Sequence, residues 1–187
     1  MPLLSLGNIQ LDQVLGGGIE EERCTILAGE PGSGKTALAL QFITDPSVSH
    51  LPCAYICIDK KPEKIMEKAI QMNESVNNHI QSGHLKFVEI SIQEWDPEQP
   101  INELLLTIQL QVDALFRNFN AKRVIIDSIL PNSLLGFSAE NKQYFMREFL
   151  QIIHAYPTTS LGLLYDVGAH HSLWLDTNII SDQLIFQ

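Results

Sequence analysis

Two kinds of hydrophobic pattern alternate along the chain: short, nearly continuous apolar runs, and longer segments with apolar residues at helical spacing. Continuous apolar runs are typical of parallel strands that are buried on both faces. The alternation predicts a mostly parallel central sheet covered by helices, a three-layer α/β/α domain. We expect strands at Cys24–Ala28, Ala54–Asp59, Lys86–Ser91, Arg123–Asp127, Ser160–Tyr165 and Gln183–Phe186.

Three segments have the apolar spacing of amphipathic helices. Pro62–Met72 begins with a proline, which is favoured in the first turn of a helix. Ile101–Phe119 has the clearest pattern, and Ala139–His154 has a similar one. No internal repeat, linker or low-complexity stretch separates these elements, so residues 1–187 are expected to form a single domain.

Residues 29–36 match G-x-x-x-x-G-K-[ST], the pattern of phosphate-binding loops. In such a loop, backbone N–H groups surround a polyphosphate, and glycines let the backbone approach it closely. The helical segment Thr36–Ile43 follows the loop, and its N-terminus would point at the phosphates. An ordinary glycine-rich turn between a strand and a helix is the alternative. The predicted nucleotide-binding residues are Gly29, Glu30, Pro31, Gly32, Ser33, Gly34, Lys35, Thr36 and Ala37.

A magnesium site is predicted beside this loop. Lys35 would neutralise the β- and γ-phosphates, and the Thr36 hydroxyl would bind Mg²⁺. Arg123–Asp127 is an apolar segment that ends in a carboxylate, and its end is expected at the ligand crevice beside the phosphate loop. Asp127 is therefore predicted to orient Mg²⁺ and its waters. Strands also end in aspartate at ordinary turns, so this prediction depends on the phosphate loop.

Composition narrows the classes of partner. The chain has 12 Lys and Arg residues against 22 Asp and Glu residues, a formal net charge of −10. This balance argues against DNA as a ligand, because nucleic-acid surfaces need clustered basic residues. The three cysteines have the spacing of neither a disulfide framework nor a zinc site. No run reaches the ~20 apolar residues that span a bilayer, and no signal peptide is recognisable, so a cytoplasmic protein without membrane contact is expected.

Beyond the phosphate loop, the chain resembles the KaiC-type ATPase domain, in the RecA-like branch of the P-loop proteins. The residues L-D-Q-V-L-G-G-G-I at Leu11–Ile19, just before the first expected strand, carry the most specific part of the resemblance. The resemblance implies a RecA-like fold with ATP and Mg²⁺ as ligands, and the absence of an N-K-x-D guanine-reading motif agrees with adenine. Further matching segments are Ala39–Phe42, Tyr55–Pro62, Gly83–Val88, Val124–Ser128 and Ile180–Ile185.

The chain departs from this family at two places. Family members usually carry two glutamates after the second strand, one of which polarises the attacking water, and the corresponding residues here are Asp59 and Lys60. Asp59 is thereby the candidate catalytic residue, although its side chain is one methylene shorter. The family also has a C-terminal hairpin whose basic residues reach a neighbouring subunit, and the chain ends before it, at Gln187. A general base accelerates such a reaction by about 10²–10⁴-fold, and a cation from a neighbouring subunit by about 10³–10⁵-fold. Because the chain departs from the family at both, slow ATP turnover is expected.

These observations predict a regulatory Mg-ATP-binding protein of the KaiC/RecA-like class with weak or absent hydrolysis. An active KaiC-type ATPase is the first alternative, and a recombinase-accessory DNA-repair protein is the second. A protein partner or self-association short of a closed active hexamer is expected, with apolar Leu130–Phe137 as the contact region if it is exposed. Tyr165 and Asp166 end a strand where RecA-like proteins place a polar sensor of the γ-phosphate, a role considered for Asp166.

Overall fold

The computed structural model describes residues 2–45, 50–92, 98–134, 136–165 and 183–186. In this part of the chain, the main sheet has six strands in the order β5-β4-β6-β7-β3-β8, and every neighbouring pair is parallel. All expected strands are confirmed, with ends within one residue of those predicted. Their bounds are β3 Cys24–Gly29, β4 Cys53–Ile58, β5 Leu85–Ile90, β6 Arg123–Asp127, β7 Thr159–Tyr165 and β8 Gln183–Phe186.

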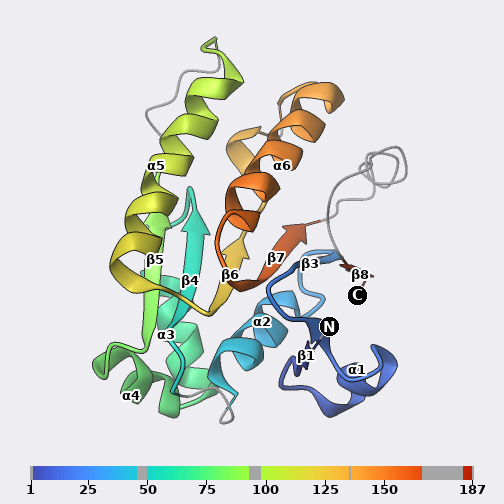
Figure 1. Ribbon diagram of the computed structural model, residues 1–187, viewed down its shortest axis with the longest axis vertical. Helices are drawn as coiled ribbons and strands as arrows, with labels where there is room; N and C mark the ends of the chain where they lie inside the picture. Colours follow the sequence, from blue (N-terminus) through green and yellow to red (C-terminus); the bar gives the residue numbers. More distant parts are fainter. Residues whose placement is uncertain (1, 46–49, 93–97, 135, 166–182, 187) are drawn as a thin grey trace.

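Helices cover both faces of this sheet, which confirms the three-layer α/β/α fold (Figure 1). The three amphipathic segments form helices as predicted, and the helix after the phosphate loop forms too. A further short helix, α4, was not predicted from the sequence. The bounds of these helices are α2 Lys35–Thr44, α3 Glu63–Met72, α4 Ser75–Gln81, α5 Ile101–Phe119 and α6 Ala139–His154.

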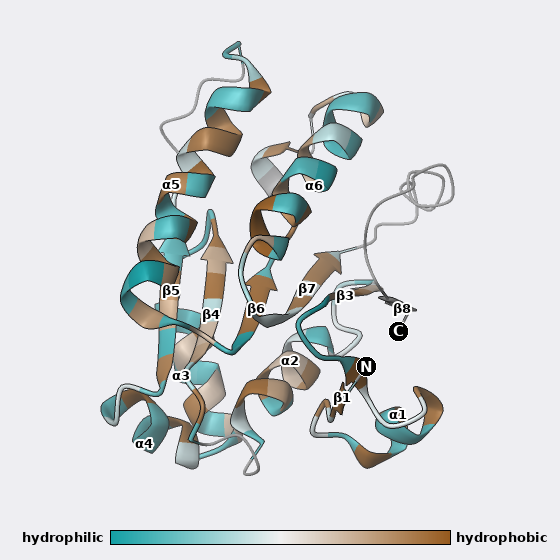
Figure 2. Cartoon of the chain, in the orientation of Figure 1, coloured by the Kyte–Doolittle hydropathy of each residue, from teal (hydrophilic) through white to brown (hydrophobic). Residues whose placement is uncertain are grey.

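Successive strand residues enter two separate hydrophobic cores, one on each side of the sheet. Ile26 packs in the core that contains Leu104 of α5 and Phe145 of α6. Leu27, the next residue, packs in the core that contains Phe42 of α2. Figure 2 shows the apolar strands between helices whose ribbons alternate apolar and polar residues. The continuous apolar runs in the sequence therefore reflect burial on both faces.

The N-terminal segment forms a small hairpin and helix that the hydrophobic pattern did not predict. Strands β1 (Leu3–Leu4) and β2 (Ile19–Glu20) pair antiparallel and enclose α1 (Ile9–Val14). The Asp12 carboxylate accepts hydrogen bonds from the Leu6 N–H (2.8 Å) and the Ser5 hydroxyl (2.6 Å). These elements contain Leu11–Ile19, the stretch that carries the most specific part of the family resemblance. It thus has a structural role just before the strand that leads to the phosphate loop.

The apolar stretch Leu130–Phe137 does not form an exposed surface in the part that the structure describes. Leu130 and Leu134 are buried in the same core as the α6 side chains, and Phe137 packs against that core. The Ser128 hydroxyl donates to the Leu130 carbonyl (3.0 Å) and accepts from its N–H, which turns the chain back under α6. The contact role was expected only if this stretch is exposed, and its described apolar side chains do not meet that condition because they pack in the core beneath α6.

Candidate nucleotide-binding site

The phosphate loop lies between the end of β3 and the start of α2, as predicted. Gly32 and Gly34 have φ angles of 86° and 96°, in the left-handed region that favours glycine. Gly34 is the N-cap residue of α2 and has no side chain to cap the first N–H groups of that helix. The space where a Cβ of Gly32 would stand is open to 4 Å. The loop therefore has a helix N-terminus without a side-chain cap and open room at Gly32, features that would suit an anion such as phosphate.

Lys35 is only 2% exposed, and its ammonium group donates hydrogen bonds to the loop itself. The acceptors are the carbonyl oxygens of Gly29 (2.8 Å) and Glu30 (2.6 Å) and the hydroxyl of Ser33 (3.2 Å). Burial lowers the pKa of Lys35, and the charge of Asp127 acts in the opposite direction. The lysine is thus held inside the loop, where a bound phosphate would be its natural counter-ion.

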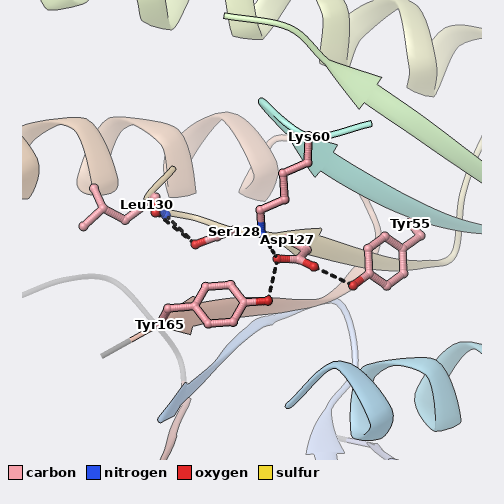
Figure 3. A network of polar contacts seen from close by, with 6 residues as sticks. All are labelled: Tyr55, Lys60, Asp127, Ser128, Leu130 and Tyr165. Atoms are coloured by element: carbon pink, nitrogen blue, oxygen red, sulfur yellow. Dashed lines mark hydrogen bonds and ion pairs between the residues drawn. The ribbon is translucent and has the colours of Figure 1, made fainter. Parts of the chain in front are cut away.

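Asp127 is buried at the end of β6, and its carboxylate accepts hydrogen bonds from three side chains (Figure 3). The Tyr55 hydroxyl donates to Oδ2 at 2.8 Å. The Lys60 ammonium donates to Oδ1 at 2.7 Å, and the Tyr165 hydroxyl donates to the same oxygen at 3.0 Å. Two of these donors come from or directly follow β4, and the third ends β7. One carboxylate therefore connects three adjacent strands, β4, β6 and β7.

Both tyrosines remain protonated donors at neutral pH. Burial and the nearby charge of Asp127 raise the pKa of Tyr55 far above its usual value of 10.0. The same two causes raise the pKa of Tyr165 to about 12, although a hydrogen bond from Thr36 opposes them. The two phenols therefore remain available as donors to Asp127 well above neutral pH.

Strand order explains why Tyr165 takes part in this network. The end of β6 was expected at the ligand crevice beside the phosphate loop, and in the sheet β7 runs between β3 and β6. Tyr165 is level with Gly29 on one side, and Leu163 is level with Asp127 on the other. The phenol, which is also hydrogen-bonded to Thr36, therefore bridges the loop and Asp127. Its partner in the sensor prediction, Asp166, lies outside the described residues.

A family model described as "ATPase: KaiC" matches residues 6–167, which include the loop, Asp127 and all three of its donors. The chain belongs to the KaiC ATPase family. The sequence resemblance and the RecA-like fold are thereby confirmed. Membership of this family implies a nucleotide and, with it, Mg²⁺.

The chain is also similar to individual proteins. The UPF0273 protein PH0284 of Pyrococcus horikoshii is 28% identical over 126 residues, which are 64% of this chain and 51% of that protein. The circadian clock oscillator protein KaiC of Picosynechococcus sp. is 28% identical over 121 residues, 64% of this chain and 23% of that protein. The UPF0273 protein MK0039 of Methanopyrus kandleri is 27% identical over 139 residues, 68% of this chain and 54% of that protein. The match spans about half of the archaeal relatives and less than a quarter of KaiC.

In this KaiC-family chain, the two residues that depart from the family's glutamate pair behave differently. Asp59 has a φ of 55°, and its N–H donates to the Ile90 carbonyl at 3.0 Å. The Asp59 Oδ1 atom is buried and has no hydrogen-bond partner among the described residues. Lys60 instead extends to Asp127. The structure therefore brings Lys60 into the site, and a catalytic role for Asp59 stays a prediction.

The expected magnesium ligands, Thr36 and Asp127, are connected through a shared partner, and both are engaged in hydrogen bonds. The Tyr165 hydroxyl is hydrogen-bonded to both residues, and the Lys60 ammonium takes the same Asp127 oxygen. Within the described residues, no group of three or more His, Cys, Asp or Glu side chains could hold a metal ion. Mg²⁺ bound directly to Asp127 Oδ1 would have to displace both donors from that oxygen, so the arrangement does not fit the ion there.

Sequence reasoning missed Tyr55 and Lys60 as members of this site. Tyr55 carries a polar hydroxyl in an otherwise apolar buried strand, and such a hydroxyl needs a partner. Lys60 follows the same strand at the carboxyl end of the sheet, where Asp127 also lies. Both signals were present, but only the strand order shows that β4 neighbours β6.

Among the helices that the structure describes, none combines the length and the apolar character that crossing a bilayer requires. The cytoplasmic location expected from the sequence stays a prediction.

Proposed function

We propose that this chain binds ATP at residues 29–37, hydrolyses it slowly or not at all, and acts as a regulatory module whose partner binding depends on the nucleotide. The observation that carries the proposal is the phosphate loop itself, with Lys35 buried at the start of α2 and uncapped N–H groups around it. Family membership supports adenine nucleotide as the ligand. A protein partner, or further copies of the chain, would bind with an affinity that depends on the bound nucleotide.

Slow turnover is supported by the residues that stand where the family has glutamates. A general base must lie within hydrogen-bond reach of the attacking water. Asp59 is shorter than glutamate and lies on a left-handed backbone turn, while Lys60 is a cation tied to Asp127. Neither residue reproduces the pair of carboxylates that the family uses.

An active ATPase is the second candidate, and one observation favours it. The Asp59 Oδ1 atom is buried without a partner among the described residues, as expected of an oxygen that accepts a hydrogen bond from the attacking water. A phosphate-release assay at several protein concentrations separates the two candidates. Slow release that Asp59→Asn leaves unchanged supports the regulatory proposal, and brisk release that Asp59→Asn abolishes supports the ATPase.

Nucleotide binding itself is tested by titrating a fluorescent ATP analogue against the native chain and Lys35→Ala. The variant should lose about tenfold or more in affinity, because it removes a charge-assisted contact to phosphate. Lys61→Ala is a matched control, since Lys61 is 71% exposed and pairs with Glu89 on the surface. It should bind like the native chain. Equal affinity of the native chain and Lys35→Ala would contradict the proposed site.

A further inference from the structure

Lys60 differs from an ordinary surface lysine in where its charge lies. Its ammonium group is 2.7 Å from Asp127 Oδ1, and the Asp127 side chain is only 1% exposed against 34% for the lysine. A buried carboxylate needs a charge partner or several donors, and here Lys60 is its cation. The ion pair lies at the carboxyl end of the sheet, on the strand end that was expected to orient Mg²⁺.

Tyr165 links this ion pair to the phosphate loop. Its ring centroid is 4.7 Å from the ammonium of Lys60 and 4.7 Å from the ammonium of Lys35. Its hydroxyl bonds to both expected magnesium ligands, Thr36 and Asp127. Two ammonium groups and one carboxylate thus gather around a single phenol, and they leave one positive charge in excess.

A divalent ion at the same place would meet unfavourable surroundings. At Asp127 its two charges would lie beside the Lys60 ammonium, and like charges at short range repel each other. It would also have to break the bonds that Lys60 and Tyr165 make to Asp127. The site already carries a cation supplied by the chain.

We propose that the Lys60 ammonium takes the place of Mg²⁺ at Asp127, so that this chain binds nucleoside triphosphate without a divalent cation. The inference rests on the proposed nucleotide binding and adds its ionic requirement. Lys35 and Lys60 together neutralise part of the polyphosphate charge, and Asp127 holds Lys60 in position. An ammonium group offers hydrogen bonds but does not coordinate the β- and γ-phosphate oxygens as Mg²⁺ does in P-loop proteins, which agrees with slow turnover.

The test compares affinity for a fluorescent ATP analogue in excess EDTA and in millimolar Mg²⁺. The native chain should bind in the two conditions with affinities within about threefold of each other. Lys60→Gln should lose about tenfold or more in EDTA, and Mg²⁺ should restore part of this loss because Asp127 is then free to receive the ion. Lys60→Arg keeps the charge and should retain binding in EDTA. Lys61→Gln, its exposed neighbour, is the control and should behave like the native chain.

Two results overturn the proposal without touching nucleotide binding. One is native affinity that falls more than about threefold in EDTA, and the other is a folded Lys60→Gln that binds in EDTA as tightly as the native chain. Thermal unfolding establishes that the variant is folded; where it is not, the native comparison decides alone. Failure of the native chain to bind in either condition overturns the proposed function and this inference with it.

Discussion

At the scale of single residues, Asp127 organises the site. Its carboxylate is buried and holds two tyrosine hydroxyls and one ammonium group. The phosphate loop could be read from the sequence because all of its chemistry lies within nine consecutive residues. The partners of Asp127 could not, because they come from segments that only the strand order brings together.

Replacing Tyr55 by Phe should weaken the fold by about 1–2 kcal/mol, because Asp127 Oδ2 loses its donor inside the protein. Urea unfolding followed by circular dichroism measures this loss. Tyr144→Phe is the matched control: its hydroxyl donates to Asn102 Oδ1 in an exposed position, and its removal should change stability by less than about 0.5 kcal/mol. A Tyr55 variant as stable as the Tyr144 variant would contradict the role given to the buried bond.

At the scale of elements, the strands and long helices were predictable because their patterns are local. Ile101–Phe119 and Ala139–His154 form the helices α5 and α6 with the predicted bounds. The N-terminal hairpin was not predictable in the same way. Its strands have two residues each and depend on a carboxylate, Asp12, that binds the chain six and seven residues before it. Such contacts leave no hydrophobic period in the sequence.

The three successive glycines of this hairpin should not tolerate substitution equally. A Cβ on Gly18 would lie 2.0 Å from the Leu4 carbonyl oxygen, whereas a Cβ on Gly16 would meet no atom within 4 Å. Both residues have positive φ, so alanine strains the backbone at either position. Gly18→Ala should therefore cost more stability than Gly16→Ala, by about 1–3 kcal/mol beyond the shared strain. Melting temperatures measured side by side test this, and equal losses would refute the role of the close approach.

At the scale of the whole molecule, the sheet buries ionisable groups between its two helical layers. Burial raises the pKa of the Cys53 thiol to about 11 and that of the Cys57 thiol to about 12, from an ordinary value of 9.0. Well below pH 9 these thiols are protonated in both the folded and the unfolded chain. Above it, the unfolded chain loses protons that the folded chain keeps, so stability falls as pH rises.

The free energy of unfolding should therefore decrease between pH 9 and about 11, by up to about 1.4 kcal/mol per pH unit for each thiol. Urea unfolding at stepped pH values measures the slope. A variant with Cys53→Ala and Cys57→Ala should show a shallower slope over the same window, whatever its stability at pH 7. An identical slope in the two proteins would mean that these thiols do not carry the effect.

The contacts of Asp127 with β4, β6 and β7 affect how an inactive variant of this protein should be designed. As the expected magnesium-orienting carboxylate, Asp127 is an obvious residue to replace in a loss-of-function variant. Here its removal would leave the Lys60 ammonium and two tyrosine hydroxyls without their acceptor. Loss of activity in such a variant would not distinguish lost chemistry from a destabilised fold. Genetic work is better served by Lys35→Ala, whose hydrogen bonds stay within one loop, and by Lys60→Gln, which leaves both tyrosines paired with Asp127.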